Sequence, residues 1–125
     1  MTKSIVKEKS FQFSIKVINL YKYLVEEKRE YVMSKQILRS GTSIGANIAE
    51  AMAAQSKKDF MYKLSISLKE SSETMYWIEL LQISKYITEE TGENLHNEAN
   101  ELYKILTSII KTTREKEEQK NKYKT

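Results

Sequence analysis

Four polar side chains recur on one side of a segment in the middle of the chain, residues 36–51. An α-helix turns by about 100° per residue, which brings these four together on one face: Arg39, Ser43, Asn47 and Glu50. A guanidinium, a hydroxyl, an amide and a carboxylate in this arrangement can form ion pairs and hydrogen bonds to a neighbouring helix or subunit. Such buried or half-buried polar contacts fix the register of packed helices more reliably than they add stability. We therefore interpret these four positions as structural.

Two carboxylates, Glu70 and Glu73, follow at helical spacing further along the chain. Carboxylate pairs in helical bundles hold metal ions when Glu-x-x-His motifs accompany them, and the chain contains no such motif. Its one histidine, His96, lies on a polar helix surface three residues after Glu93, which favours a solvated side chain over a metal ligand. We expect no metal site and no cofactor.

The residue types on which most catalytic sites depend are scarce. The chain has no cysteine and one histidine, and it contains no phosphate-binding loop or Ser/His/Asp arrangement. We expect no catalytic residues, and the chain is interpreted as a protein that is not an enzyme. An enzyme or a metal carrier remains the third alternative, which metal analysis of the purified protein would test.

Composition indicates the elements that position these residues. The chain has 125 residues, no proline and only three glycines, and 30% of its residues are charged. A shortage of turn-forming residues favours long helices over a sheet, so the predicted class is all-α in a single domain over residues 1–125. The first ten residues are too charged for a signal peptide, and no apolar run approaches the ~18 residues of a membrane span, so we expect a cytoplasmic protein that does not bind membranes.

Apolar residues at three- and four-residue spacing predict four amphipathic helices, at residues 9–28, 32–54, 57–85 and 89–116. Ser56 and Thr88 have the residue type and spacing of N-caps for the third and fourth helices. The polar tail at residues 118–125 predicts fraying or disorder. Short connections favour antiparallel neighbours, so the predicted fold is an up-down-up-down antiparallel four-helix bundle.

Two glycines, Gly41 and Gly45, lie one turn apart on the second predicted helix. Each costs about 1 kcal/mol of helix propensity relative to alanine. We expect that the missing side chains let a neighbouring helix approach closely. The alternative is a helix that breaks at Gly41.

The bundle topology gathers basic residues at one end, where both termini and the connection between the second and third helices meet. The opposite end is expected to be acidic. The basic residues that we interpret as candidate phosphate contacts are Lys3, Lys7, Lys9, Lys57, Lys58, Arg114 and Lys116. Ordinary solvated surface is the alternative interpretation of these side chains.

The third predicted helix carries two apolar stripes, more than one subunit core needs. One stripe includes Trp77, which is typical of a packing or interface anchor, although an exposed tryptophan can also stack on a nucleobase. The residues interpreted as an oligomer interface are Tyr62, Ile66, Glu70, Glu73, Trp77 and Leu80.

The sequence resembles the four-helix-bundle proteins encoded in intervening sequences of bacterial 23S rRNA genes. The resemblance rests on the run from Gln36 to Ala51, on Ser56-Lys57-Lys58-Asp59-Phe60, and on the later groups Leu68-Lys69-Glu70, Glu73-Thr74 and Tyr76-Trp77. Many members have proline where this chain has Gly45 and glycine where it has Ala51. The resemblance implies a homopentamer. It also implies kinship with the accessory variability protein of diversity-generating retroelements, which binds nucleic acid and works with a reverse transcriptase.

Together these observations predict a non-catalytic, oligomeric bundle that binds RNA or DNA independently of sequence. Its expected role is that of an adaptor for an RNA-processing or reverse-transcription partner. The alternative is a protein–protein interaction module that does not bind nucleic acid and uses the second stripe of the third helix to dock a partner.

Overall fold

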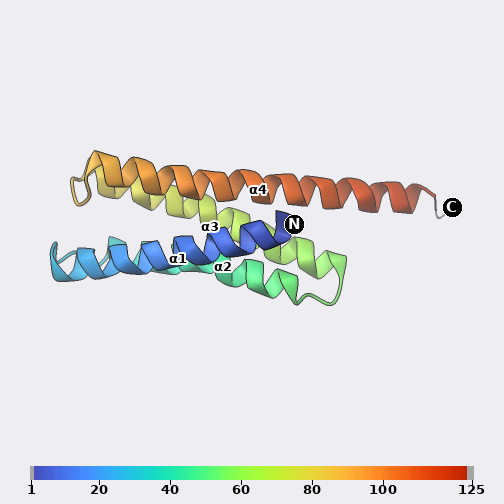
Figure 1. The fold of residues 1–125 in the computed structure, drawn as a ribbon, viewed down its shortest axis with the longest axis horizontal. Coiled ribbons are helices and arrows are strands. Elements are labelled where there is room, and N and C mark those ends of the chain that lie inside the picture. The colour runs from blue at the N-terminus through green and yellow to red at the C-terminus, as the bar shows by residue number, and fades with distance from the viewer. Residues whose placement is uncertain (1, 124–125) are drawn as a thin grey trace.

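Four helices follow one another in alternating directions in a computed structural model that describes residues 2–123 (Figure 1). They are α1 (Thr2–Glu26), α2 (Met33–Met52), α3 (Lys57–Ile83) and α4 (Glu89–Lys122). Each helix packs along the one before it, α1 and α4 touch less extensively, and in the described residues no Cα atom of α1 lies within 8 Å of one in the diagonal helix α3. This arrangement confirms the predicted all-α, up-down-up-down four-helix bundle.

Two helices are longer than the sequence pattern indicated. The first helix begins at Thr2 instead of residue 9, because Val6 and Ser10 continue its buried stripe toward the N-terminus. The fourth helix continues to Lys122 instead of ending near residue 116, so residues 118–122 of the expected frayed tail are helical. Residues 124–125 lie outside the described part of the chain.

The extra turns of α4 contain no helix-breaking residue, and they project beyond the other helices (Figure 1). Glu117 is tied to α3 by an ion pair with Lys57, in which Nζ lies 3.1 Å from Oε1. Lys120 and Lys122 lie in the last turn, where positive charge interacts favourably with the helix dipole. These features explain why the polar sequence stays helical.

The core lies along the common axis of the helices and takes apolar side chains from all four. Its largest members that are fully buried include Phe13, Leu24, Ile37, Ile44, Ile48, Leu64, Ile78, Leu81, Leu102 and Leu106. Between α2 and α3 the packed surface also contains small hydroxyl residues. Ser67 donates a 2.7 Å hydrogen bond to the Ile44 carbonyl oxygen, and the Thr74 and Ser40 hydroxyl oxygens lie 2.9 Å apart. Small polar groups of this kind let α2 and α3 approach closely with their hydrogen bonds satisfied.

The second helix passes through Gly41 and Gly45 without a break. A Cβ atom at Gly41 would lie 2.8 Å from both γ-carbons of Val17, which is fully buried on α1. At Gly45 an added Cβ would lie 3.2 Å from the Ser14 hydroxyl oxygen. The glycines therefore permit the close approach of α1 and α2 that their spacing predicted.

Polar side chains begin three of the helices. The Ser56 hydroxyl accepts a 3.1 Å hydrogen bond from the Asp59 backbone N–H, and the Thr88 hydroxyl accepts one of 3.1 Å from Thr91, which confirms both predicted N-caps. The start of α2 uses a residue that the sequence did not reveal. The Glu30 carboxylate accepts backbone hydrogen bonds from Val32, Met33 and Ser34 at 2.7 to 3.0 Å.

The side chain of Glu30 is buried, with 7% of the residue exposed. Burial by itself raises the pKa of this carboxyl group, but the backbone N–H groups of Met33, Ser34 and Val32 stabilise the charged form more strongly. The pKa of Glu30 is therefore lowered overall. Glu30 acts as the anionic cap of α2.

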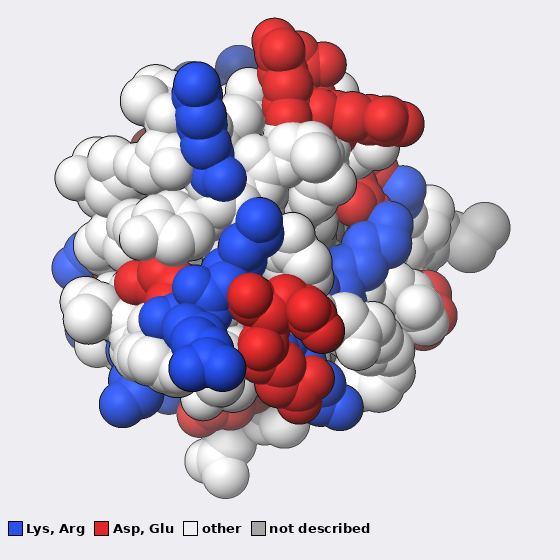
Figure 2. Space-filling view, turned by 90° about the vertical axis from the view of Figure 1, so that its left-hand side faces the viewer, with Lys and Arg blue, Asp and Glu red and all other residues white. Residues whose placement is uncertain are grey.

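The end of the bundle opposite the N-terminus is less uniformly charged than expected. Figure 2 shows lysine and arginine side chains interspersed with groups of acidic side chains on this end. Glu30, which lies at this end, is buried as a helix cap and adds little to the surface charge. In the described part of the chain, no helix combines the length and the apolar character that a membrane span requires.

Candidate nucleic-acid interface

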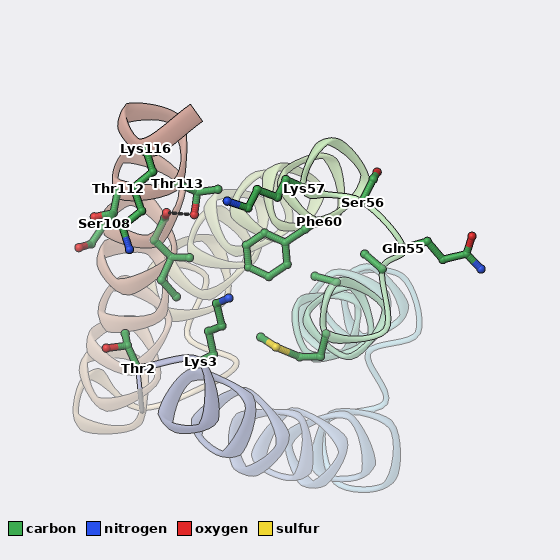
Figure 3. Close-up of a pocket in the computed structure, with 14 residues that line it drawn as sticks. Thr2, Lys3, Gln55, Ser56, Lys57, Phe60, Ser108, Thr112, Thr113 and Lys116 are labelled. Carbon is green, nitrogen blue, oxygen red and sulfur yellow. Dashed lines mark hydrogen bonds between the residues drawn. The ribbon is translucent and has the colours of Figure 1, made fainter. Parts of the chain in front are cut away.

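A cavity of about 640 Å³ opens between the helix ends at the predicted basic end of the bundle (Figure 3). All four helices and the connection between α2 and α3 contribute to its wall. The apolar part of the wall includes Ala51, Met52, Phe60 and Ile109, and the polar part includes the hydroxyl groups of Ser108, Thr112 and Thr113.

Three of the predicted basic residues, Lys3, Lys57 and Lys116, line this cavity, and no aspartate or glutamate does. The Lys3 ammonium nitrogen lies 4.6 Å from the centre of the Phe60 ring, a cation–π contact between α1 and α3. Lys57 is paired with Glu117, whereas no described carboxylate lies within ion-pair distance of Lys3 or Lys116. Positive charge in the cavity is therefore only partly compensated.

The other four predicted basic residues lie outside the cavity wall and are exposed. Lys9 forms an ion pair with Glu101 of α4. Lys7, Lys58 and Arg114 have no described carboxylate within ion-pair distance. The structure thus brings Lys3, Lys57 and Lys116 to one cavity. Three of the remaining candidates, Lys7, Lys58 and Arg114, are exposed outside the cavity wall and are not paired with a described carboxylate.

The polar residues of α2 divide into two groups. Arg39 reaches across to α3, where it donates a 3.1 Å hydrogen bond to Glu70 and a second hydrogen bond to Glu73. Glu50 forms a 3.3 Å ion pair with Lys63 of α3. Ser43 and Asn47 instead donate to carbonyl oxygens of their own helix, at 2.6 and 2.8 Å.

Arg39, Glu70, Glu73 and Trp77 form a polar cluster that joins α2 to α3. The Trp77 indole N–H donates a 3.1 Å hydrogen bond to the same Glu73 oxygen that Arg39 contacts. Burial raises the pKa of Glu73, but the Trp77 and Arg39 hydrogen bonds and the Arg39 charge outweigh it, so this pKa is lowered. The hydrogen bond from Arg39 to Glu73 correspondingly raises the pKa of the guanidinium. Both groups are charged at neutral pH, as an ion pair within one subunit.

The predicted oligomer interface on α3 is only partly free. Glu70 and Glu73 are occupied by Arg39, and Trp77 packs in part against the core. Ile66 and Leu80 are half-buried, and Tyr62 is 61% exposed. Two further exposed residues of α3 lie two and three seven-residue repeats after Tyr62, namely Tyr76 at 55% and Ile83 at 78% exposure.

A second exposed apolar face lies on α1, and the sequence analysis did not assign it. Phe11, Ile15 and Ile18 share one side of α1 and are 39 to 60% exposed. Beside them runs a groove of about 730 Å³ whose far wall on α2 includes Gly45, Ala46 and Ala49. The sequence feature that could have revealed this face is the width of the apolar surface of α1, because that surface is wider than a bundle core covers.

His96 lies 3.0 Å from a carboxylate oxygen of Glu79 on α3, at the bundle surface. No group of three or more His, Asp or Glu side chains in residues 2–123 is arranged to hold a metal ion.

These features define the class: an all-helical up-down-up-down bundle with basic side chains gathered around a cavity at one end. The model of the 23S rRNA-intervening sequence protein family matches residues 2–108, and the chain belongs to that family. The match covers the bundle and stops within α4, before the projecting turns.

A solved structure agrees with this assignment. The chain is 58% identical, with a TM-score of 0.88, to a Bacteroides thetaiotaomicron protein described as having unknown function and as coming from the S23 ribosomal protein family. The match covers 89% of this chain and 99% of the other. Among curated proteins, none matches this chain.

Proposed function

We propose that this protein is a non-catalytic, oligomeric bundle of the cytoplasm whose basic end binds nucleic acid independently of sequence. The observation that carries the proposal is the gathering of Lys3, Lys57 and Lys116 from three different helices around one cavity. Phosphate groups along a strand offer regularly spaced negative charge, and lysine side chains recognise that charge without reading bases. By kinship with retroelement accessory proteins, the bound strand would be presented to an RNA-processing enzyme or a reverse transcriptase.

Association of subunits would strengthen this interaction. A closed ring requires two different complementary patches on each subunit, because one patch of a subunit meets the other patch of the next. The apolar faces on α1 and α3 supply two such patches, and they lie on diagonally opposite helices of the bundle. Subunits joined in this way would direct all their basic ends to the same side. A ring of five is the state that the family resemblance favours.

Fluorescence anisotropy with a labelled single-stranded oligonucleotide tests the nucleic-acid proposal. If three phosphates are contacted, affinity should fall about twentyfold between ~50 and ~200 mM salt, because counterion release makes binding salt-dependent. Both RNA and DNA of unrelated sequences should bind. A protein that binds neither at low salt, or binds with no salt dependence, would remove the proposal.

A charge-reversal pair sharpens the test. Lys58→Glu combined with Arg114→Glu should weaken binding, since both side chains are exposed near the basic end. Lys22→Glu combined with Lys35→Glu makes the same change in total charge near the opposite end and should leave binding nearly unchanged. An equal loss of affinity in both double variants would mean that binding depends on the net charge of the protein and not on its basic end.

The alternative is a protein–protein interaction module that does not bind nucleic acid. The observation that favours it is the groove between α1 and α2, whose wall is mostly apolar or small. Size-exclusion chromatography with light scattering separates the two, because a stable monomer would leave that groove free for a different partner protein.

A further inference from the structure

The cavity at the basic end has features that a general phosphate-binding surface does not need. Its lysines come from α1, α3 and α4 and surround a partly enclosed space instead of lying along a strip. Figure 3 shows Lys3 directed toward the Phe60 ring and Lys57 directed from α3 toward Thr113 of α4. A long strand that contacts lysines on an open surface would gain nothing from such a recess.

Lys3 is held in place although no carboxylate within residues 2–123 pairs with it. An exposed lysine near a helix terminus ordinarily extends into water, where its ammonium group is best hydrated. Here the ammonium group lies over the Phe60 ring, and Phe60 itself packs against the core. This contact positions one positive charge inside the cavity in advance, which lowers the entropy lost when an anion binds.

The charge of the cavity matches a small dianion. Lys57 is neutralised by its 3.1 Å ion pair with Glu117, so Lys3 and Lys116 supply the uncompensated charge. The hydroxyl groups of Ser108 and Thr112 add hydrogen-bond donors, while Thr113 donates to the Ile109 carbonyl oxygen of its own helix. Two cations with neighbouring hydroxyl donors suit a phosphomonoester, which carries a charge between −1.5 and −2 at about pH 7.

The apolar wall suits what is attached to that phosphate. Met52, Phe60 and Ile109 form a surface against which a nucleoside can pack, and the volume of about 640 Å³ accommodates one nucleotide. An internal phosphodiester carries only one charge, and its strand must both enter and leave. A strand end enters a recess without this constraint.

We propose that this cavity is a binding site for a phosphomonoester, supplied by the phosphorylated end of a nucleic-acid strand. The inference rests on the proposed nucleic-acid binding and deepens it. General binding then comes from the surrounding basic surface, and the preference for a phosphorylated end comes from Lys3 and Lys116.

The test compares two labelled ten-nucleotide thymidine oligomers that differ only in a 5′-phosphate, measured by anisotropy with the full-length protein. We expect the phosphorylated strand to bind about tenfold more tightly, since a charge-assisted hydrogen bond contributes about 1.5 kcal/mol or more. Lys3→Ala combined with Lys116→Ala should reduce this preference to about onefold. Lys7→Ala combined with Lys58→Ala, which removes equal charge outside the cavity, should weaken both strands and keep the preference.

The outcomes separate the inference from the proposed function. Equal affinity for the two strands, with normal salt dependence, would overturn the phosphomonoester site and leave general binding standing. Loss of the preference in both variant pairs would also overturn the site. Failure to bind either strand would overturn the proposed function together with the inference. Circular dichroism of each variant confirms that it is folded.

Competition with adenosine 5′-monophosphate and with inorganic phosphate distinguishes the source of the phosphate. If both compounds compete only at concentrations far above that of the phosphorylated oligomer, the site is assigned to strand ends. If adenosine 5′-monophosphate competes at a concentration equal to that of the oligomer, the strand end is overturned as the source of the phosphate, and the ligand of the cavity is a free nucleotide.

Discussion

At the scale of single residues, two kinds of charged side chain stabilise the structure. The first kind pairs with residues distant in sequence, and the second is buried and held by backbone N–H groups. Arg39 illustrates the first case, because its carboxylate partners lie on the next helix. Glu30 illustrates the second, because three backbone N–H groups and burial determine its ionisation. Their residue types alone would mark both as ordinary surface positions.

Removing the Glu30 cap should destabilise the start of α2. We expect Glu30→Ala to lower the free energy of unfolding by about 1–2 kcal/mol at pH 7, as for other lost helix caps. Because the pKa of Glu30 is lowered in the folded state, the unfolded chain takes up the proton first as pH falls. The stabilisation is fully present above about pH 5 and disappears as pH falls below about 4.3 through the folded-state pKa.

Urea denaturation at a series of pH values measures this effect. Glu30→Gln is the control, because it keeps an oxygen acceptor but cannot ionise. The stability difference between wild type and Glu30→Gln should shrink as pH falls. A difference that stays constant from pH 7 to pH 3 would contradict the role of the charge.

The Arg39 cluster contributes more modestly, because Arg39 is half exposed and water screens its charges. Arg39→Ala should cost about 1 kcal/mol of stability, of the size measured for favourable exposed pairs. The coupling should appear in a double-mutant cycle with Glu73→Ala, since each change removes the same contact. If the losses of stability from the two substitutions are strictly additive, the interaction between Arg39 and Glu73 contributes nothing to stability.

At the scale of helices, the contact between α1 and α2 depends on a missing side chain. The clash at Gly41 involves both γ-carbons of Val17 at 2.8 Å, so no rotation of that side chain relieves it. We expect Gly41→Ala to destabilise by about 1–2 kcal/mol, because the overpacking cost exceeds the gain of about 1 kcal/mol in helix propensity.

Gly45→Ala provides the matched comparison on the same helix face. An added Cβ there would lie 3.2 Å from the Ser14 hydroxyl, which can rotate away, and 3.3 Å from the Ser10 carbonyl oxygen, which cannot. This crowding is milder than at Gly41, and the gain of about 1 kcal/mol in helix propensity should offset it, so this change should be nearly neutral. Combining Gly41→Ala with Val17→Ala should recover part of the loss from the clash. If urea denaturation gives equal changes in the free energy of unfolding for the two glycine variants, helix propensity and not packing determines that change.

At the scale of the whole molecule, two exposed apolar faces on diagonal helices make a definite prediction about assembly. Phe11 on α1 and Tyr62 on α3 are almost equally exposed, at 60% and 61%. We expect the wild-type protein to be oligomeric and both Phe11→Glu and Tyr62→Glu to be monomeric in light scattering. Each change places a charge in one of the two patches of a head-to-tail contact.

Mixing the two variants tests the geometry. Each retains one intact patch, so an equimolar mixture should form a one-to-one dimer that cannot grow further. A self-complementary patch would behave differently, since one of the two variants would still assemble alone. A monomeric wild-type protein would contradict the prediction outright.

The sequence by itself determined much of the local structure. Apolar spacing defined four helices, the hydroxyl residues Ser56 and Thr88 defined two of their starts, and the glycines on α2 indicated a close helix contact. These features depend on neighbours within a few residues, which is why sequence patterns reveal them. The true start of α1 and the helical end of α4 were missed because charged residues without a breaker are compatible with both helix and coil.

Only the tertiary structure decided which side chains meet. It assigned Glu70 and Glu73 to Arg39, brought Lys3, Lys57 and Lys116 to one cavity, and left Phe11 on an uncovered face. Periodicity shows that a helix has a second apolar stripe, but not whether another helix covers it. That outcome depends on the relative positions and rotations of all four helices, which are fixed by packing across the whole core.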